Sequence, residues 1–110
     1  MAEGDEKNRS LQLAKIAEAT ERWKDMVEHL TKMVKVSTTD LTLEERNLLS
    51  VGFKNIIGQR RAALRQLDNL LSDDNSKYKE VAVVYRAKIK KEAEQICKDF
   101  MALYEEKLGD

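Results

Sequence analysis

Proline is absent from this chain of 110 residues, only four glycines are present, and aromatic residues make up 5% of the sequence. A β-sheet protein needs turn residues and runs of β-branched residues, and neither occurs here in quantity. An apolar content of 42% with zero net charge disfavours disorder, because such a chain can bury enough surface to collapse. The composition therefore predicts an all-α fold.

Cysteine and unbalanced charge are scarce as well. The single Cys97 excludes an internal disulfide, and one thiolate cannot by itself hold a metal. Twenty basic residues balance twenty acidic ones, so no overall field attracts nucleic acid. The longest apolar run, 81–85, is far below the roughly 20 residues of a membrane span, and the N-terminus lacks the apolar core of a signal peptide. We therefore expect a cytoplasmic or nuclear protein with no cofactor, no metal, no nucleic-acid partner and no membrane span.

Residues suited to catalysis are few. His29 is the only histidine and lies beside an apolar helical stripe. Ser50 lacks the GxSxG context of a nucleophile, and Cys97 is expected to be a small buried hydrophobe on the inward side of the last helix. Carboxylates are abundant, but they follow the spacing of a helix surface. The sequence predicts that the chain is not an enzyme.

The first part of the chain is predicted to form two short helices. Residues 1–7 are expected to be a flexible polar tail, and 8–108 a single helical domain that begins at Asn8 or Ser10. Whether residues 20–22 break the first helix from the second is left open by the pattern. The second helix has one apolar stripe at helical spacing, formed by Trp23, Met26, Val27, Leu30, Met33 and Val34.

Two long helices are predicted after a polar loop at 37–40. Thr42 and Glu45 have the spacing of a capping box, which starts a helix over about 43–71. The last helix is expected over about 76–107. Its inward side is expected to consist of Val81, Val84, Tyr85, Ile89, Ala93, Ile96, Cys97, Phe100, Met101 and Tyr104. Together the patterns predict an antiparallel bundle of four helices, two short and two long. Helices near thirty residues are about 45 Å long, so two short ones cannot cover them fully; we expect self-association or a further C-terminal half.

A row of cations is predicted on the third helix. Lys54, Arg61 and Arg65 lie within about 20° of one line at 100° per residue, and Gly58 lies between them. No acidic residue occurs over 46–66. An ammonium and a guanidinium at one spot suit a phosphate dianion. Three interpretations remain open: a solvated face paired with acids on other helices, a phosphate or acidic-peptide site, and a weak nucleic-acid contact.

The run of residues 44–61, EERNLLSVGFKNIIGQRR, closely resembles the signature of the 14-3-3 family, with Phe53 where tyrosine is usual. Residues 13–23 resemble the family's first helix and the start of its second, and 85–89 with Glu92, Ile96 and Cys97 resemble its fourth. The resemblance implies the N-terminal, dimer-forming part of a cup-shaped dimer whose protomers have nine antiparallel helices. It implies a signalling adaptor that binds phosphoserine or phosphothreonine peptides of client proteins.

The same resemblance assigns roles to individual residues. Lys54 and Arg61 match phosphate ligands, Arg65 matches a weaker supporting position, and the other ligands belong to later helices. Pairs of opposite charge between two subunits, as a homodimer or a heterodimer with relatives, are implied for Arg22 with Glu92 and for Asp25 with Lys88. Tyr85 is expected to pack between these pairs, with further apolar packing of the first helix against Leu67, Leu70 and Tyr85.

The chain also departs from the family pattern. Leu64 replaces the tryptophan usual after the double arginine, Ala62 and Ala63 precede it where many members carry a serine, and the segment 90–94 diverges. These changes indicate a divergent member or relaxed constraint, and they leave the choice of client open. The alternative function is a purely structural helical dimerisation module that binds no phosphate.

Overall fold

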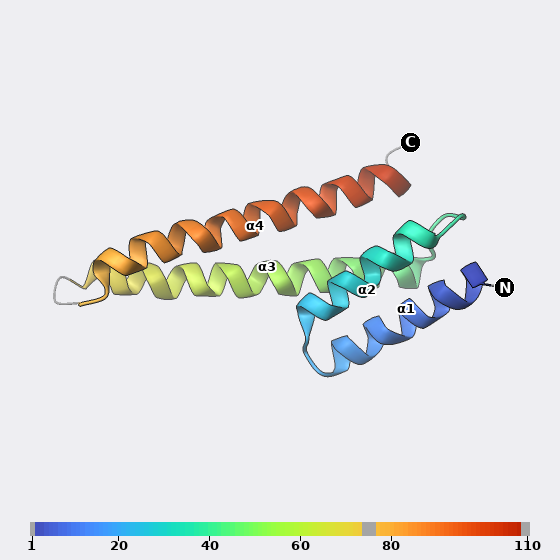
Figure 1. Cartoon of the computed structure of the whole chain (residues 1–110), viewed down its shortest axis with the longest axis horizontal. Coiled ribbons are helices and arrows are strands. Elements are labelled where there is room, and N and C mark those ends of the chain that lie inside the picture. Colours follow the sequence, from blue (N-terminus) through green and yellow to red (C-terminus); the bar gives the residue numbers. More distant parts are fainter. Residues whose placement is uncertain (1, 74–76, 109–110) are drawn as a thin grey trace.

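The computed structural model describes residues 2–73 and 77–108 and consists there of four helices (Figure 1). Helix α1 spans Ala2–Ala19, α2 Trp23–Val36, α3 Leu43–Ser72 and α4 Lys79–Leu108. The first two contain 18 and 14 residues, and the last two contain 30 each. The prediction of an all-α bundle with two short and two long helices is confirmed.

The long helices α3 and α4 run antiparallel and side by side along the 60 Å length of the molecule (Figure 1). The hairpin of α1 and α2 packs against the N-terminal part of α3. Figure 1 shows that this hairpin covers only one end of the α3–α4 pair. The last part of α3 and the first part of α4 extend beyond it.

Helix α1 starts earlier than the sequence predicted. It begins at Ala2, so residues 2–7 belong to the helix rather than preceding it, and the predicted start at Asn8 or Ser10 is wrong. Acidic residues near a helix N-terminus are favoured by the helix dipole, and Asp5 and Glu6 lie there. The segment is also attached to α3, because Lys7 Nζ lies 3.2 Å from Glu45 Oε2.

A tight turn separates α1 from α2 and answers the question left open at residues 20–22. Glu21 adopts a left-handed conformation with φ of 57°. The Arg22 N–H donates to the Ala17 carbonyl at 2.9 Å, and the Glu21 N–H donates to the Glu18 carbonyl at 3.1 Å. This pair of hydrogen bonds is a Schellman motif, which ends α1 with a residue in the left-handed region.

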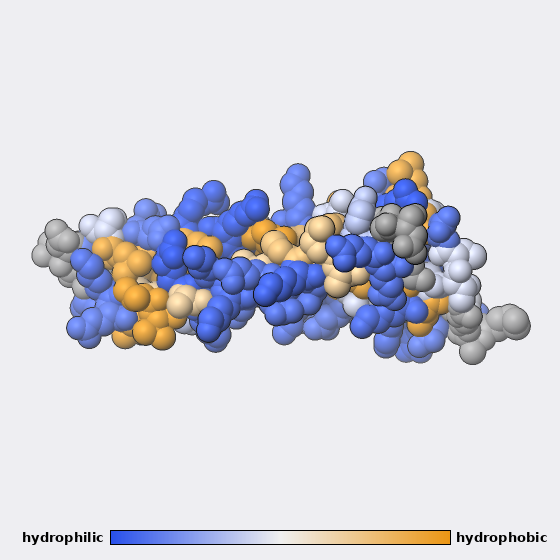
Figure 2. Space-filling model, turned by 90° about the horizontal axis from the view of Figure 1, so that it is seen from above, coloured by the Kyte–Doolittle hydropathy of each residue, from blue (hydrophilic) through white to orange (hydrophobic). Residues whose placement is uncertain are grey.

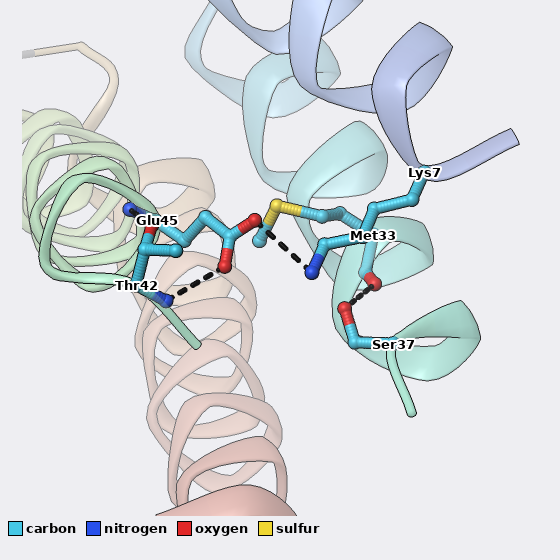
Figure 3. A network of polar contacts seen from close by, with 5 residues as sticks. All are labelled: Lys7, Met33, Ser37, Thr42 and Glu45. Carbon is cyan, nitrogen blue, oxygen red and sulfur yellow. Dashed lines mark hydrogen bonds and ion pairs between the residues drawn. The ribbon is translucent and has the colours of Figure 1, made fainter. Parts of the chain in front are cut away.

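The start of α3 is held by the predicted capping box. The Thr42 N–H donates to Glu45 Oε1 at 2.8 Å, and the Glu45 N–H donates to the Thr42 hydroxyl at 3.1 Å (Figure 3). The second carboxylate oxygen of Glu45 faces Lys7, as Figure 3 shows. At the end of α2, the Ser37 hydroxyl donates to the Met33 carbonyl at 2.7 Å. These contacts fix the loop at 37–40 between α2 and α3.

The main core lies where the hairpin meets α3. Four side chains of the predicted α2 stripe are fully buried: Met26, Leu30, Met33 and Val34. They pack with buried residues of α3, including Phe53, whose ring meets that of Phe100 edge to face at a centroid distance of 4.5 Å. A smaller cluster of Leu67, Ala82 and Ile89 joins α3 to α4 at the other end.

The inward face of α4 differs from the prediction. Ile89 is buried as predicted, and Ala82 and Leu103 are buried as well. Several residues expected to point inward are exposed: Val81, Val84, Tyr85, Cys97, Met101 and Tyr104. Apolar residues occur on more than one side of this helix, so periodicity alone does not decide which side meets α3. None of the described helices has the length and apolar character needed to cross a membrane.

Candidate functional site

The predicted cation row lies on an open face of α3. Lys54, Arg61 and Arg65 are all exposed. At 1.5 Å per residue, Lys54 and Arg61 are about 10 Å apart along the axis, and Arg61 and Arg65 about 6 Å. A Cβ atom at Gly58 would meet nothing within 4 Å, so the surface between these cations is open. We call Lys54, Gly58, Arg61 and Arg65 the cation strip.

The first interpretation of this row was that acidic side chains on other helices neutralise it. The described part of the chain contains no acidic side chain paired with these cations. No ion pair there involves Lys54, Arg61 or Arg65. The neighbouring Arg60 differs, because its Nε lies 3.6 Å from Glu92 Oε1 on α4. The two adjacent arginines therefore have different surroundings, one turned to α4 and one left open to a ligand.

The five predicted dimer residues lie on two separate elements. Arg22 and Asp25 lie at the start of α2, where Arg22 Nε donates to Asp25 Oδ2 at 2.5 Å. On α4, Lys88 Nζ lies 5.6 Å from the centroid of the Tyr85 ring, and Glu92 faces Arg60. Each predicted inter-subunit charge therefore has a neighbour within its own chain. An assembly that pairs Arg22 with Glu92 has to exchange these contacts.

Exposed apolar side chains lie on α1, on the last part of α3 and on the first part of α4. Ile16 on α1 is 60% exposed, and Val81 and Val84 on α4 are 71% and 72% exposed. Tyr85 is half exposed and Leu70 is exposed, whereas Leu67 is buried in the α3–α4 cluster and cannot contact another subunit as expected. Figure 2 shows an apolar patch at the end of the molecule where α4 begins. We call Ile16, Leu70, Val81, Val84 and Tyr85 the apolar face.

The residues considered for catalysis are scattered over the structure. His29 is half-buried on α2, Ser50 is exposed on α3, and Cys97 is exposed on α4, so its predicted burial is wrong. Within residues 2–73 and 77–108, no group of three or more His, Cys, Asp or Glu side chains is arranged to hold a metal ion.

The contact between Lys7 and Glu45 was missed by sequence reasoning. Glu45 is almost fully buried, with 6% of its side chain exposed, and Lys7 is 23% exposed. The capping-box spacing predicted the contact of Glu45 with Thr42. Nothing in the polar sequence of residues 1–7 indicated that Lys7 contacts Glu45. This ion pair joins the first turns of α1 to the start of α3, and so helps to place the helix that carries Ile16.

Comparison with known proteins supports the resemblance. Residues 13–110 match the family model described as "14-3-3 protein". The chain belongs to the 14-3-3 family. It is 41% identical over 108 residues to a 14-3-3-like protein of Solanum tuberosum, covering 94% of this chain and 42% of the relative. It is 44% identical over 103 residues to a 14-3-3 protein homolog of Candida albicans, covering 90% and 39%.

A third relative, 14-3-3 protein 3 of Entamoeba histolytica, is 42% identical over 100 residues, covering 87% of this chain and 41% of the relative. The chain thus spans about two-fifths of the length of these 14-3-3 relatives. The matched part includes α2, α3, α4 and residues 13–19 of α1, and therefore both the cation strip and the apolar face.

Proposed function

We propose that this 14-3-3 chain binds phosphoserine or phosphothreonine peptides as a non-enzymatic adaptor, and that it supplies a dimer interface and part of the phosphate site. The observation that carries the proposal is the cation strip. Three exposed cations share one side of α3, and no ion pair of the described residues occupies them. Exposed cations can bind a phosphate, and members of this family bind phosphopeptides.

The chemistry of capture follows from the side chains. The guanidinium of Arg61 can donate two parallel hydrogen bonds to phosphate oxygens, while Lys54 adds a point charge. Gly58 lets a peptide backbone approach the helix between them. Because these cations are exposed to water, their attraction is screened, and we expect binding in about the millimolar range for this chain alone.

Dimerisation is the second part of the proposal. The apolar face gives two copies a surface to bury, and a two-fold dimer carries two cation strips that can bind a doubly phosphorylated client with avidity. A homodimer is the simplest assembly, and a heterodimer with a relative uses the same face.

The exposed free thiol of Cys97 suits a reducing compartment, for which we propose the cytoplasm and the nucleus.

A purely structural dimerisation module is the competing function, and it is favoured by the same apolar face. The two functions differ in their dependence on Lys54. We expect a phosphoserine peptide titrated into the ¹⁵N-labelled chain to shift amide resonances of α3, and Lys54→Glu to abolish the shifts, because it places a carboxylate beside the phosphate.

The matched control is Lys32→Glu, which makes the same charge change at an exposed position of α2. The control and an unphosphorylated peptide with wild-type chain separate local binding from general charge effects. Equal shifts in wild type and Lys54→Glu, or none in either, would support the structural module.

A further inference from the structure

A groove with an apolar floor runs along α3 and α4 beside the cation strip. Its volume is about 420 Å³. Ile57 and Leu64 are two helical turns apart on α3, and Ala93 and Cys97 are one turn apart on α4, so each pair lies on one side of its helix. Ile57, Leu64 and Ala93 are half-buried, and Cys97 is exposed. The floor can therefore take an aliphatic side chain from outside.

The rim of this groove is basic. Arg61 contributes from α3, and Lys90 and Lys98 contribute from α4, against one carboxylate, Glu94. Three cations to one anion is a local excess in a chain whose total charge is zero. All four charged side chains are exposed, and none takes part in an ion pair within residues 2–73 and 77–108. The charge complements an acidic ligand.

Some of the departures from the family pattern line this groove. Leu64 stands where tryptophan is usual, and Lys90, Ala93 and Glu94 belong to the divergent segment at 90–94. A leucine leaves more room than a tryptophan, so this departure widens the floor, and Lys90 adds charge to the rim. Changes at separate places in the sequence thus affect one surface.

Arg61 belongs both to the cation strip and to the groove, so one bound peptide can reach both. We propose that the groove selects client phosphopeptides with an aliphatic residue and acidic residues next to the phosphorylated one. The phosphate lies on the cation strip, the aliphatic side chain lies on the floor, and the acidic side chains face Lys90 and Lys98. This inference rests on the proposed function, because it extends the same site.

The experiment compares two phosphoserine peptides that differ only beside the phosphoserine, one with Leu and two Glu and the other with Gly and two Lys. Binding is followed by amide shifts of the 110-residue chain, and the alkylation rate of Cys97 by N-ethylmaleimide reports whether the floor is covered. We expect the acidic peptide to bind about tenfold more tightly, as two or three exposed charge contacts allow. At saturation it should slow alkylation at least about threefold, whereas the basic peptide leaves the rate unchanged.

Paired variants assign the effect to the groove. Lys90→Glu with Lys98→Glu should remove the preference for the acidic peptide and keep the binding of the basic one. Lys24→Glu with Lys32→Glu makes the same charge change on α2 and should keep the preference. Circular dichroism is used to check that each double variant is folded.

The outcomes separate this inference from the proposed function. Equal affinity for both peptides with Cys97 still reactive would overturn the inference alone and leave phosphate binding intact. A Cys97 that is unreactive before any peptide is added would overturn it too, because a second copy or another segment would already cover the floor. No binding of either phosphopeptide would overturn the proposed function itself.

Discussion

Glu21 carries the one backbone conformation in the described chain that is unfavourable for its residue type. Its φ of 57° lies in the left-handed region, which a non-glycine L-residue occupies at some cost. The Schellman hydrogen bonds of Glu21 and Arg22 hold it there. Glu21 therefore has an unfavourable backbone conformation in the turn that directs Arg22 and the start of α2 toward the predicted dimer contacts.

Glycine at this position should stabilise the chain. We expect Glu21→Gly to raise the free energy of unfolding by about 0.5–1 kcal/mol, because glycine adopts a positive φ without steric cost. Urea denaturation followed by circular dichroism measures the change. The control is Glu18→Gly, within helical α1, which should destabilise by about 1 kcal/mol. A loss of stability in Glu21→Gly would show that the side chain of Glu21 matters more than its backbone.

At the scale of elements, two ion pairs join α1 to the start of α3, and they differ in burial. Lys7 and Glu45 form one whose carboxylate is 6% exposed, and Lys15 and Glu44 form another, at 2.5 Å, whose side chains are 50% and 60% exposed. A buried charge that loses its partner is costly, whereas an exposed pair contributes little. The two pairs therefore allow a comparison of a buried and an exposed ion pair between the same two helices.

Removing each lysine should separate the two cases. We expect Lys7→Met to lower the free energy of unfolding by about 2 kcal/mol, less than the full cost of an unpaired buried charge, because the Thr42 N–H still donates to Glu45. Lys15→Met should cost at most about 0.5 kcal/mol. Urea denaturation of the two variants measures both values. Equal small losses would show that the first turns of α1 are not held by this contact.

How well each helix could be predicted depends on whether its apolar residues lie on one side of the helix. Helix α3 was predicted to within one residue at its end, since Thr42 and Glu45 mark its start and polar residues follow Leu71. Helix α4 has valines at 81, 83 and 84, which point to different sides, so its inward face was predicted only in part. The early start of α1 depends on Lys7 meeting a residue far along the chain, which no local pattern contains.

The candidate site shows the same division. Helical spacing alone placed Lys54, Arg61 and Arg65 on one side of α3, and the structure leaves all three exposed. The pairing of Arg60 with Glu92 and the groove beside Arg61 depend on how α4 packs against α3. These features depend on tertiary packing, and the residue spacing within one helix does not predict them.

For the whole molecule, we expect the proposed dimer to depend on apolar contact more than on charge. The predicted inter-subunit charges already have neighbours in their own chain, so their exchange in a dimer gains little free energy. Burial of Ile16 removes apolar surface from water, and a two-fold axis makes the contact twice. The apolar face should therefore set the dimer affinity.

Sedimentation equilibrium at several concentrations tests this account of assembly. We expect Ile16→Glu to weaken the dimer about 100-fold, which corresponds to about 1.4 kcal/mol for each of two contacts. Leu43→Glu, at a more exposed apolar residue outside the apolar face, should leave the dimer unchanged. Glu92→Arg reports the contribution of charge separately. A monomeric wild type, or a dimer that Ile16→Glu does not affect, would mean that this face does not assemble.

The central claim is that the cation strip binds a phosphate, and the most direct measurement is the pKa of that phosphate. Phosphoserine has a second pKa near 6, and neighbouring cations favour its dianion and so lower this pKa. We predict from a ³¹P NMR titration that the pKa of the bound peptide's phosphate falls by roughly half a pH unit. Lys54→Glu should abolish the decrease. A peptide that binds while its phosphate keeps the free pKa would contradict the account.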